Sequence, residues 1–300
     1  MKLAVILGFV AQVMRISVPY VLAALGGTLS ERSGVINIAL EGMLLVGAFA
    51  AAVGSLAGGA LAGIALGVLA GVALAALYGV AVIRWRADQI VCGVAATLLA
   101  GGLTRFFLKL AFDSSSNSPR IPGLPAPAWA TGGGAMAFVA TLTSPLVLLT
   151  IALVALVHVG LGRTRLGLRL RAVGEHPEAA ASLGVRVVPL RWAGVLASGA
   201  LAGLGGVWLA YDQHGFVANM SAGRGYIALA AMILGGWSPL GGAAACLLFG
   251  AAETVGLRLQ NLQAAGGGGL VQALPYLVTI TALALRARRS AAPRALGTPW

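Results

Sequence analysis

The sequence predicts an all-α fold, a polytopic membrane helix bundle of about nine spans, with eight to ten as the range. Three observations predict it. Hydrophobic residues make up 59% of the 300-residue chain, charged residues only 9%, and the mean hydropathy is +0.94. A soluble protein carries roughly a quarter charged residues, so these few charges cannot cover a water-exposed surface. The 44 glycines suit close contact between helices in lipid. We expect residues 1–300 to form a single transmembrane domain.

A membrane-spanning helix needs about 20 mostly apolar residues. The apolar runs predict spans at 4–29, 35–55, 59–83, 89–111, 145–161, 192–211, 225–237, 240–258 and 270–286. The run 225–237 is short for a full crossing and is followed by a break at Gly235–Pro239. Such a break at membrane depth must be covered by protein or line a water-filled cavity. Segment 132–144 is apolar and glycine-rich, which is compatible with a re-entrant segment.

The net charge of +12 is carried mostly by arginines in short gaps between apolar runs. This pattern is typical of the cytoplasmic loops of membrane proteins and does not indicate nucleic-acid binding. With nine spans, the cation-rich segment 163–191 and the tail 287–300 fall on one side, which we predict to be cytoplasmic. The N-terminus then lies outside, at the start of a retained first span. The Pro/Ser/Gly-rich connection 112–144 is predicted to be extracytoplasmic, as a plain connector or a docking surface for an outside partner.

The residue types needed for catalysis or cofactor binding are scarce. No G-x-x-x-x-G-K-[ST] phosphate loop is present, and Lys2 and Lys109 are the two lysines of the chain. The histidines His158, His176 and His214 are far apart and have no carboxylate or thiol at ligand spacing. We therefore expect no enzyme activity, no metal and no cofactor bound by this chain.

Few ionisable groups lie inside the predicted spans. Asn37 and Glu41 are about one helical turn apart, so they are predicted to share one helix face. They either line a cavity or form hydrogen bonds that support helix packing. Arg15 and Glu253 are the other ionisable candidates, and Glu253 is predicted to pair with Arg258 near a helix end. An ion-coupled secondary transporter would depend on such groups.

Segment 163–191 carries the signals of a short helix at about residues 177–183. His176 precedes Pro177 at the first helical position, Glu178 follows in the first turn, and Gly184 ends the helix. The helix has an apolar Ala/Leu face and is flanked by cations. A short helix presented to the cytoplasm suits docking into a groove on a partner, and an alternative is that it rests on the membrane.

Residues Arg171 to Val185 resemble the cytoplasmic coupling loop of permease subunits in ATP-driven (ABC) importers, which has the form R-A-x-G-x-x-P-x-A-A-x-x-x-G-[IV]. Segment 30–43 looks like the signature of the nucleoside and simple-sugar branch of this family, and segment 223–241 is a third match. The resemblance covers nearly the whole chain. It is close to the shorter of two paired permeases in nucleoside importers. Branched-chain amino acid permeases share the general layout but differ at 37–42.

The resemblance implies a permease subunit in a bacterial plasma (inner) membrane that forms the translocation path for nucleosides, or for simple sugars such as ribose or galactose. The implied partners are a cytoplasmic ABC ATPase that binds ATP-Mg, a second permease (homologous or identical), an extracytoplasmic binding protein or lipoprotein, and membrane lipid. A structural membrane subunit without a transport path is a further alternative.

The same resemblance assigns roles to individual residues. Coupling to the ATPase would involve Arg171, Gly174, Glu175, Pro177, Glu178, Ala179, Ala180 and Gly184. Asn37 and Glu41 are the candidates for the translocation path.

Overall fold

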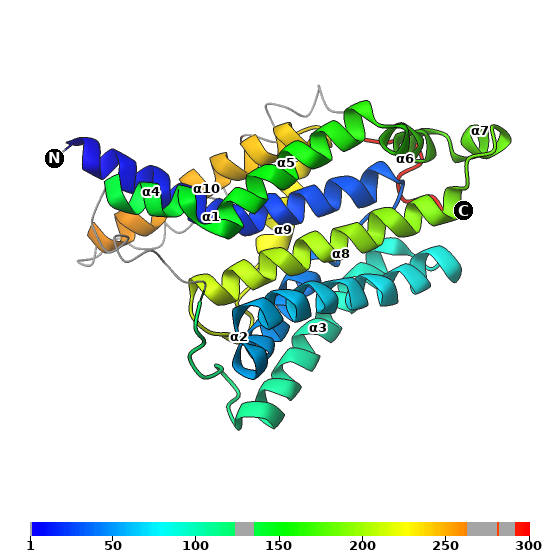
Figure 1. Ribbon diagram of the computed structural model, residues 1–300. Helices are drawn as coiled ribbons and strands as arrows, with labels where there is room; N and C mark the ends of the chain where they lie inside the picture. The colour runs from blue at the N-terminus through cyan, green and yellow to red at the C-terminus, as the bar shows by residue number, and fades with distance from the viewer. Residues whose placement is uncertain (1, 124–134, 263–280, 282–291) are drawn as a thin grey trace.

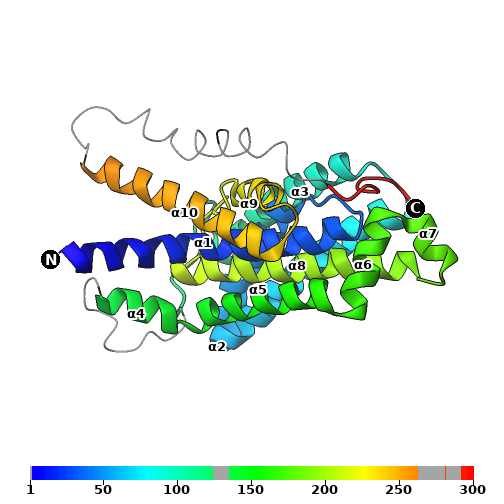
Figure 2. The same ribbon diagram turned by 90° about the horizontal axis from the view of Figure 1, so that it is seen from above.

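The computed structural model describes residues 2–123, 135–262, 281 and 292–300. The long helices lie side by side, with the N-terminus at one end of the bundle and α7 and the C-terminal residues at the other (Figures 1 and 2). The elements are α1 (Lys2–Arg32), α2 (Leu40–Gly79), η1 (Val80–Arg84), α3 (Gln89–Phe112), α4 (Ala135–Thr143), α5 (Pro145–Arg163), α6 (Arg165–Glu175), α7 (Pro177–Ser182), α8 (Val187–Asp212), α9 (Arg224–Leu234) and α10 (Pro239–Leu262).

Six helices of the described residues are long and apolar enough to cross a membrane, and α9 is a shorter apolar helix. Each predicted span from the first to 240–258 overlaps a helix, which confirms the fold class as a polytopic helix bundle. The predicted span 270–286 lies outside the described residues. Segment 132–144 contains the nine-residue helix α4.

Helix α2 and the short π-helix η1 together form a helical hairpin and account for two of the predicted spans. The backbone leaves the helical conformation at Gly58 and Gly59, and Gly59 has φ +79°. Residues on either side of this turn face each other: a Cβ added to Gly67 would lie 2.8 Å from the carbonyl oxygen of Gly47. The spans predicted at 35–55 and 59–83 are therefore the two arms of this hairpin.

Helix α8 lies at the centre of the bundle. Its most apolar stretch is 78% buried, against 22% for the peripheral helix α3. Glycines make this burial possible, because Gly199 and Gly203 of α8 pack directly against the backbone of Gly71 in the hairpin. On another side, α8 packs against α1, where Gly26 approaches the carbonyl oxygen of Ser198. Small residues thus let three backbones approach closely without polar side chains between them.

The cation-rich segments gather at one end of the bundle. Tyr78, near the end of the hairpin, donates a hydrogen bond to the carbonyl of Ile36, just beyond α1. Segments 112–123 and 213–218 meet at the opposite end, where Ser118 N–H donates to the carbonyl oxygen of Phe216 (2.8 Å). Arg32, the 84–88 gap, segment 163–191 and residues 292–300 therefore lie at one end of the fold, in agreement with the predicted grouping of 163–191 with the tail.

Helix α6 was not predicted, whereas α7 was. Thr164 caps α6 by accepting a hydrogen bond from Gly167 N–H (3.1 Å). The pattern of apolar residues did not reveal this helix, because it contains Gly167 and Gly174 and has a low apolar content. α6 runs crosswise to α5 and α8 at the end of the bundle that carries α7 (Figures 1 and 2).

Candidate functional site

Helix α9 is a half-length helix that packs against α1 and α10, and its start is held by Glu41 of α2. Glu41 Oε1 accepts a hydrogen bond from Gly223 N–H (2.8 Å), and Oε2 accepts one from Gly225 N–H (2.7 Å). These are backbone donors at a helix start that have no partner within the helix. A carboxylate is favoured there by the helix dipole as well. Glu41, which is buried, thus caps α9 from a neighbouring helix.

The other end of α9 is held by the last two residues of α1. The chain turns after Leu234 through Gly236 (φ +69°) and Trp237. Arg32 Nε donates to the carbonyl oxygen of Trp237 (2.9 Å), and Arg32 Nη2 donates to that of Gly236 (3.2 Å). The indole N–H of Trp237 donates to Glu31 Oε2 (2.6 Å). Segment 30–43 therefore clamps both ends of α9, which lies within segment 223–241. Both segments were singled out in the sequence.

The clamp is joined to α10 and α1 by one ion pair. Arg224 Nη2, in the first turn of α9, lies 3.5 Å from Glu253 Oε1. Tyr20 of α1 donates its hydroxyl hydrogen to Glu253 Oε2. The predicted pairing of Glu253 with Arg258 is wrong, because Arg258 lies over the ring of Phe9, 5.1 Å from its centroid, and contacts Gln12. Glu253 is compensated inside the bundle instead.

Asn37 lies in the irregular segment between α1 and α2. The prediction that Asn37 and Glu41 share one helix face is therefore wrong, because α2 begins only at Leu40. Asn37 Nδ2 donates to Ser198 Oγ of α8 (2.5 Å), while Asn37 Oδ1 is buried without a hydrogen-bond partner among the described residues. An unsatisfied buried carbonyl oxygen of this kind costs about 1–3 kcal/mol.

The segment predicted to couple the chain to a partner projects from the bundle end as α7. Pro177 occupies the first turn, and Glu178 and Ala179 are exposed. Gly184 has φ +81°, and the N–H groups of Gly184 and Val185 donate to the carbonyls of Ala181 and Ala180. This pair of hydrogen bonds is the Schellman motif that ends many helices. The predicted short helix at 177–183 is confirmed as Pro177–Ser182.

Glu175 links this segment to the clamp around α9. Glu175 Oε1 lies 4.0 Å from Arg32 Nη1, the same arginine that holds the end of α9. Gly174 packs so tightly on the backbone of Arg32 that an added Cβ would overlap its carbonyl oxygen. Arg171 is half-buried beside them, and its Nε has no partner in the described part of the chain. Glu175 and Gly174 of α6 therefore both contact the arginine that holds the end of α9.

Residues 292–300, here called the tail segment, cross the same region. Ala295 N–H donates to the carbonyl oxygen of Gly174 (2.9 Å), and Gly297 N–H donates to that of Gly34 (3.2 Å). Arg191 Nη1 of α8 donates to the carbonyl oxygen of Thr298 (2.8 Å). Trp300 packs against the small apolar cluster that includes Ala180 of α7. The tail segment thus ties α1, α6, α7 and α8 together.

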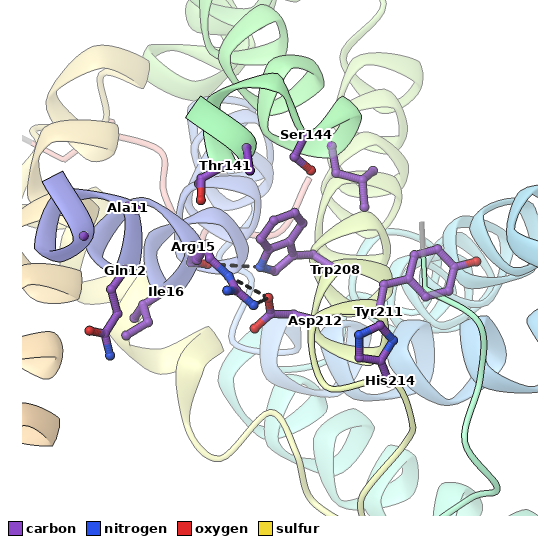
Figure 3. A pocket seen from close by; sticks show the side chains of 13 residues that line it. Ala11, Gln12, Arg15, Ile16, Thr141, Ser144, Trp208, Tyr211, Asp212 and His214 are labelled. Atoms are coloured by element: carbon purple, nitrogen blue, oxygen red, sulfur yellow. Dashed lines mark hydrogen bonds and ion pairs between the residues drawn. The ribbon is translucent and has the colours of Figure 1, made fainter. Parts of the chain in front are cut away.

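A cavity of about 680 Å³ lies at the opposite end of the molecule, between α1, α8 and the α4–α5 junction. Figure 3 shows the Trp208 ring beside the ion pair of Arg15 and Asp212, with Ser144 on the far side. Arg15 contacts Asp212 Oδ1 through Nη2 (2.5 Å) and Nε (3.0 Å). The other polar side chains of the lining are Gln12, Thr141, Tyr211 and His214.

Comparison with known proteins gives the family. Residues 9–283 match the family model described as the permease component of the branched-chain amino acid transport system. The chain belongs to this family of membrane permeases.

Individual relatives show which permeases within the family the chain is similar to. The permease is 36% identical to the guanosine ABC transporter permease protein NupQ of Bacillus subtilis, over 94% of this chain and 92% of that protein. It is 37% identical to the nucleoside ABC transporter permease protein NupC of Lactococcus lactis subsp. cremoris, over 97% and 96% of the two chains. A putative glucose ABC transporter permease, TsgC13 of Haloferax volcanii, is 34% identical over 81% and 75%. No solved structure matches the permease.

The structure brings together residues that the sequence placed in separate roles. Arg171, Gly174 and Glu175 lie at the joint with α1, whereas Pro177, Glu178, Ala179 and Gly184 lie on or just after the projecting α7. Ala180 is buried against Val173 and Val187. Glu41, expected as a path or packing residue, caps α9. These contacts are structural, and the roles of these residues in coupling and transport stay predictions.

Sequence reasoning missed Glu31 and Arg32 as the partners of Trp237, although all three stand in the quoted motifs. It also missed the tail segment, which was predicted only as a cytoplasmic tail. The available signals were Gly34 and Gly297, whose positive φ angles of +93° and +80° allow the two backbones to meet. Glycine alone does not identify its partner, so pairing these positions required the fold.

Proposed function

We propose that the permease forms the membrane path of an ABC importer for nucleosides and that a separate cytoplasmic ATPase drives it. The single observation that carries this is the near full-length similarity to the guanosine and nucleoside permeases. The fold also supports transport driven by ATP. The projecting helix α7 is joined to α9 through Glu175 and Arg32.

The proposal includes partners on both sides of the membrane. The coupling end, with α7 and the tail segment, faces the cytoplasm and receives the ATPase, which holds ATP-Mg. An extracytoplasmic binding protein delivers the substrate at the opposite end, and a second permease encloses the path. The concentration of arginines at the α7 end supports this orientation, since cytoplasmic loops are enriched in Lys and Arg.

The contacts suggest how the ATPase acts on the path. When ATP binding moves α7, the shift reaches Arg32 through Glu175 and the tightly packed Gly174. Arg32 holds the end of α9, and α9 is only 11 residues long, or about 16 Å at 1.5 Å per residue. A short helix fixed at both ends can tilt as a unit between two positions. Such a two-position element is what alternating access requires.

A simple sugar is the second candidate substrate. The similarity to the putative glucose permease favours it. Nucleosides and sugars share hydroxyl groups and lack net charge, so the few ionisable groups of the bundle fit either class. A direct transport measurement separates them.

The test is uptake by proteoliposomes that hold the permease with its ATPase, its second permease and its binding protein. We expect ATP-dependent uptake of labelled guanosine that exceeds uptake of labelled glucose. Glucose uptake alone would favour the sugar importer. Guanosine uptake without the ATPase, driven by a proton or sodium gradient, would overturn the ABC proposal.

The coupling route is tested by Glu175→Lys in the same liposomes. A lysine here places a cation beside Arg32 and removes the acceptor for the Arg294 N–H, now 3.3 Å from Glu175 Oε2. We expect ATP hydrolysis to continue while uptake per ATP falls. Arg105→Gln, on the peripheral helix α3 and exposed, is the matched control. Unchanged uptake per ATP in Glu175→Lys would contradict the route.

A further inference from the structure

The cavity at the end opposite α7 has a lining of apolar and polar residues, and its ion pair adds no net charge. Arg15 and Asp212 neutralise each other across 2.5 Å, and Gln12 and Ser144 add uncharged polar groups. A volume of about 680 Å³ lies in the roughly 300–1,000 Å³ range of small-molecule sites. A cavity that offers paired charges, amide and hydroxyl groups suits an uncharged ligand with several hydroxyl groups.

One wall of the cavity is rigid because of Pro19. Proline has no backbone N–H, so the carbonyl oxygen of Arg15, four residues earlier in α1, lacks its usual helical donor. The indole N–H of Trp208 donates to that oxygen instead (3.0 Å). The Trp208 ring is therefore fixed in the wall, beside the ion pair, as Figure 3 shows. A fixed aromatic ring favours contact with a planar group.

The ion pair leaves an acceptor unused. Both guanidinium contacts from Arg15 reach Asp212 Oδ1, so among the described residues Oδ2 has no hydrogen-bond donor. Asp212 is exposed and lines the cavity, and its Oδ1 contacts Arg15. In dinucleotide-binding proteins, a carboxylate recognises ribose by accepting a hydrogen bond from its 2′-hydroxyl group.

The cavity lies at the end of the bundle opposite α7, the end that the proposed orientation places outside. From Arg15 to Arg32 at the coupling end, α1 rises about 26 Å at 1.5 Å per residue, so the cavity and the coupling end are far apart along the bundle. The N-terminal end of α1 extends beyond the end of α8 (Figure 2). A ligand arriving from outside therefore meets this cavity before it meets α9.

We propose that this cavity is the first binding site of the permease for a nucleoside, with Asp212 accepting the ribose hydroxyls and Trp208 and His214 lying beside the base. The proposal rests on the proposed function and deepens it. It makes Asp212 a residue that distinguishes ribonucleosides from 2′-deoxyribonucleosides.

The experiment measures protection of a cavity cysteine in the assembled importer. Cys92 and Cys246 are replaced by alanine, and Ser144→Cys is introduced as an isosteric probe in the cavity lining. We expect guanosine to slow maleimide labelling of Ser144→Cys several-fold more than 2′-deoxyguanosine does. Val217→Cys, exposed at the same end but outside the cavity lining, is the matched control and should show no protection.

Asp212→Asn tests the assigned residue. In this variant, the ratio of the guanosine effect to the 2′-deoxyguanosine effect should fall towards one. This applies to protection and to uptake with saturated binding protein. The double variant Arg15→Gln, Asp212→Asn should show the same loss, since it removes the carboxylate without leaving an unpaired arginine.

The outcomes separate this site from the proposed function. Guanosine uptake by a complex whose Ser144→Cys is unprotected would overturn the cavity as a binding site and leave the function standing. Equal slowing at Ser144→Cys and Val217→Cys would overturn it as well. If guanosine protects Ser144→Cys in a complex that transports only sugar, the cavity stands as a nucleoside-binding site, and the proposed function, nucleoside import, is overturned.

Discussion

Single polar side chains replace missing backbone hydrogen bonds at two points of this bundle. Glu41 satisfies the first amides of α9, and Trp208 satisfies the Arg15 carbonyl that Pro19 leaves without a donor. Each hydrogen bond holds its side chain against the backbone group that lacks a helical partner.

Glu41→Gln should destabilise the permease by about 1–3 kcal/mol, because a neutral amide has one acceptor oxygen where the carboxylate uses two. Thermal unfolding in mild detergent measures this loss. Glu178→Gln, on the exposed face of α7, is the matched control and should leave the midpoint unchanged. An unchanged midpoint for Glu41→Gln would mean that α9 does not need this cap.

Trp208→Phe should destabilise the permease by about 1–3 kcal/mol, since it leaves the Arg15 carbonyl without a donor. In a Pro19→Ala background the same change should cost less, because the alanine introduced there supplies a helical N–H to that oxygen. The double-mutant cycle is measured by thermal unfolding. Equal costs in the two backgrounds would show that Trp208 acts only through packing.

At the scale of helices, much of the arrangement followed from sequence. The broken helix 225–237 and the short helix near 177–183 were predicted, because Gly, Pro and the charged first turn mark their ends locally. The hairpin turn at Gly58 and Gly59 was predicted only as a gap between two spans. Helix α6 and the clamp of Glu31 and Arg32 were missed. A hydrogen bond between positions 205 residues apart leaves no periodic pattern in the sequence.

The glycine contacts between the hairpin and α8 give a prediction of their own. Gly71→Ala should destabilise the bundle strongly, by about 1–3 kcal/mol, because its Cβ would overlap the carbonyl oxygen of Gly199 and force two backbones apart. Gly101→Ala in α3 is the control, as no atom of the described residues lies within 4 Å of the added Cβ. Yield and unfolding temperature in detergent compare the two variants. Similar behaviour would mean that α8 tolerates a shift at this contact.

For the whole molecule, the two ends of the bundle differ in charge and in the elements they present. The end with α7 and the tail segment carries the arginine-rich segment 163–191, and the other end carries 112–123 and the cavity. The proposed orientation makes these ends cytoplasmic and extracytoplasmic. Residues far apart in sequence must therefore share one compartment.

Cysteine labelling in intact cells tests this orientation. In a background with Cys92 and Cys246 replaced by alanine, Ser115→Cys should react with a membrane-impermeant maleimide from outside. Glu178→Cys should react only after the membrane is permeabilised. Both positions are exposed, so a difference in reaction reports the side of the membrane. The reverse pattern would invert the orientation and contradict the placement of the ATPase at α7.

The central position of α8 has a consequence for the order in which the bundle is made. The hairpin ends at Arg84, whereas α8 begins at Val187. At roughly 5–20 residues per second, synthesis delivers α8 on the order of 5–20 seconds after the hairpin. During this interval the glycine-lined backbones of α1 and the hairpin face lipid without the helix that covers them. A chaperone or insertase that shields this groove during synthesis would therefore shorten the time in which the nascent permease can mispair.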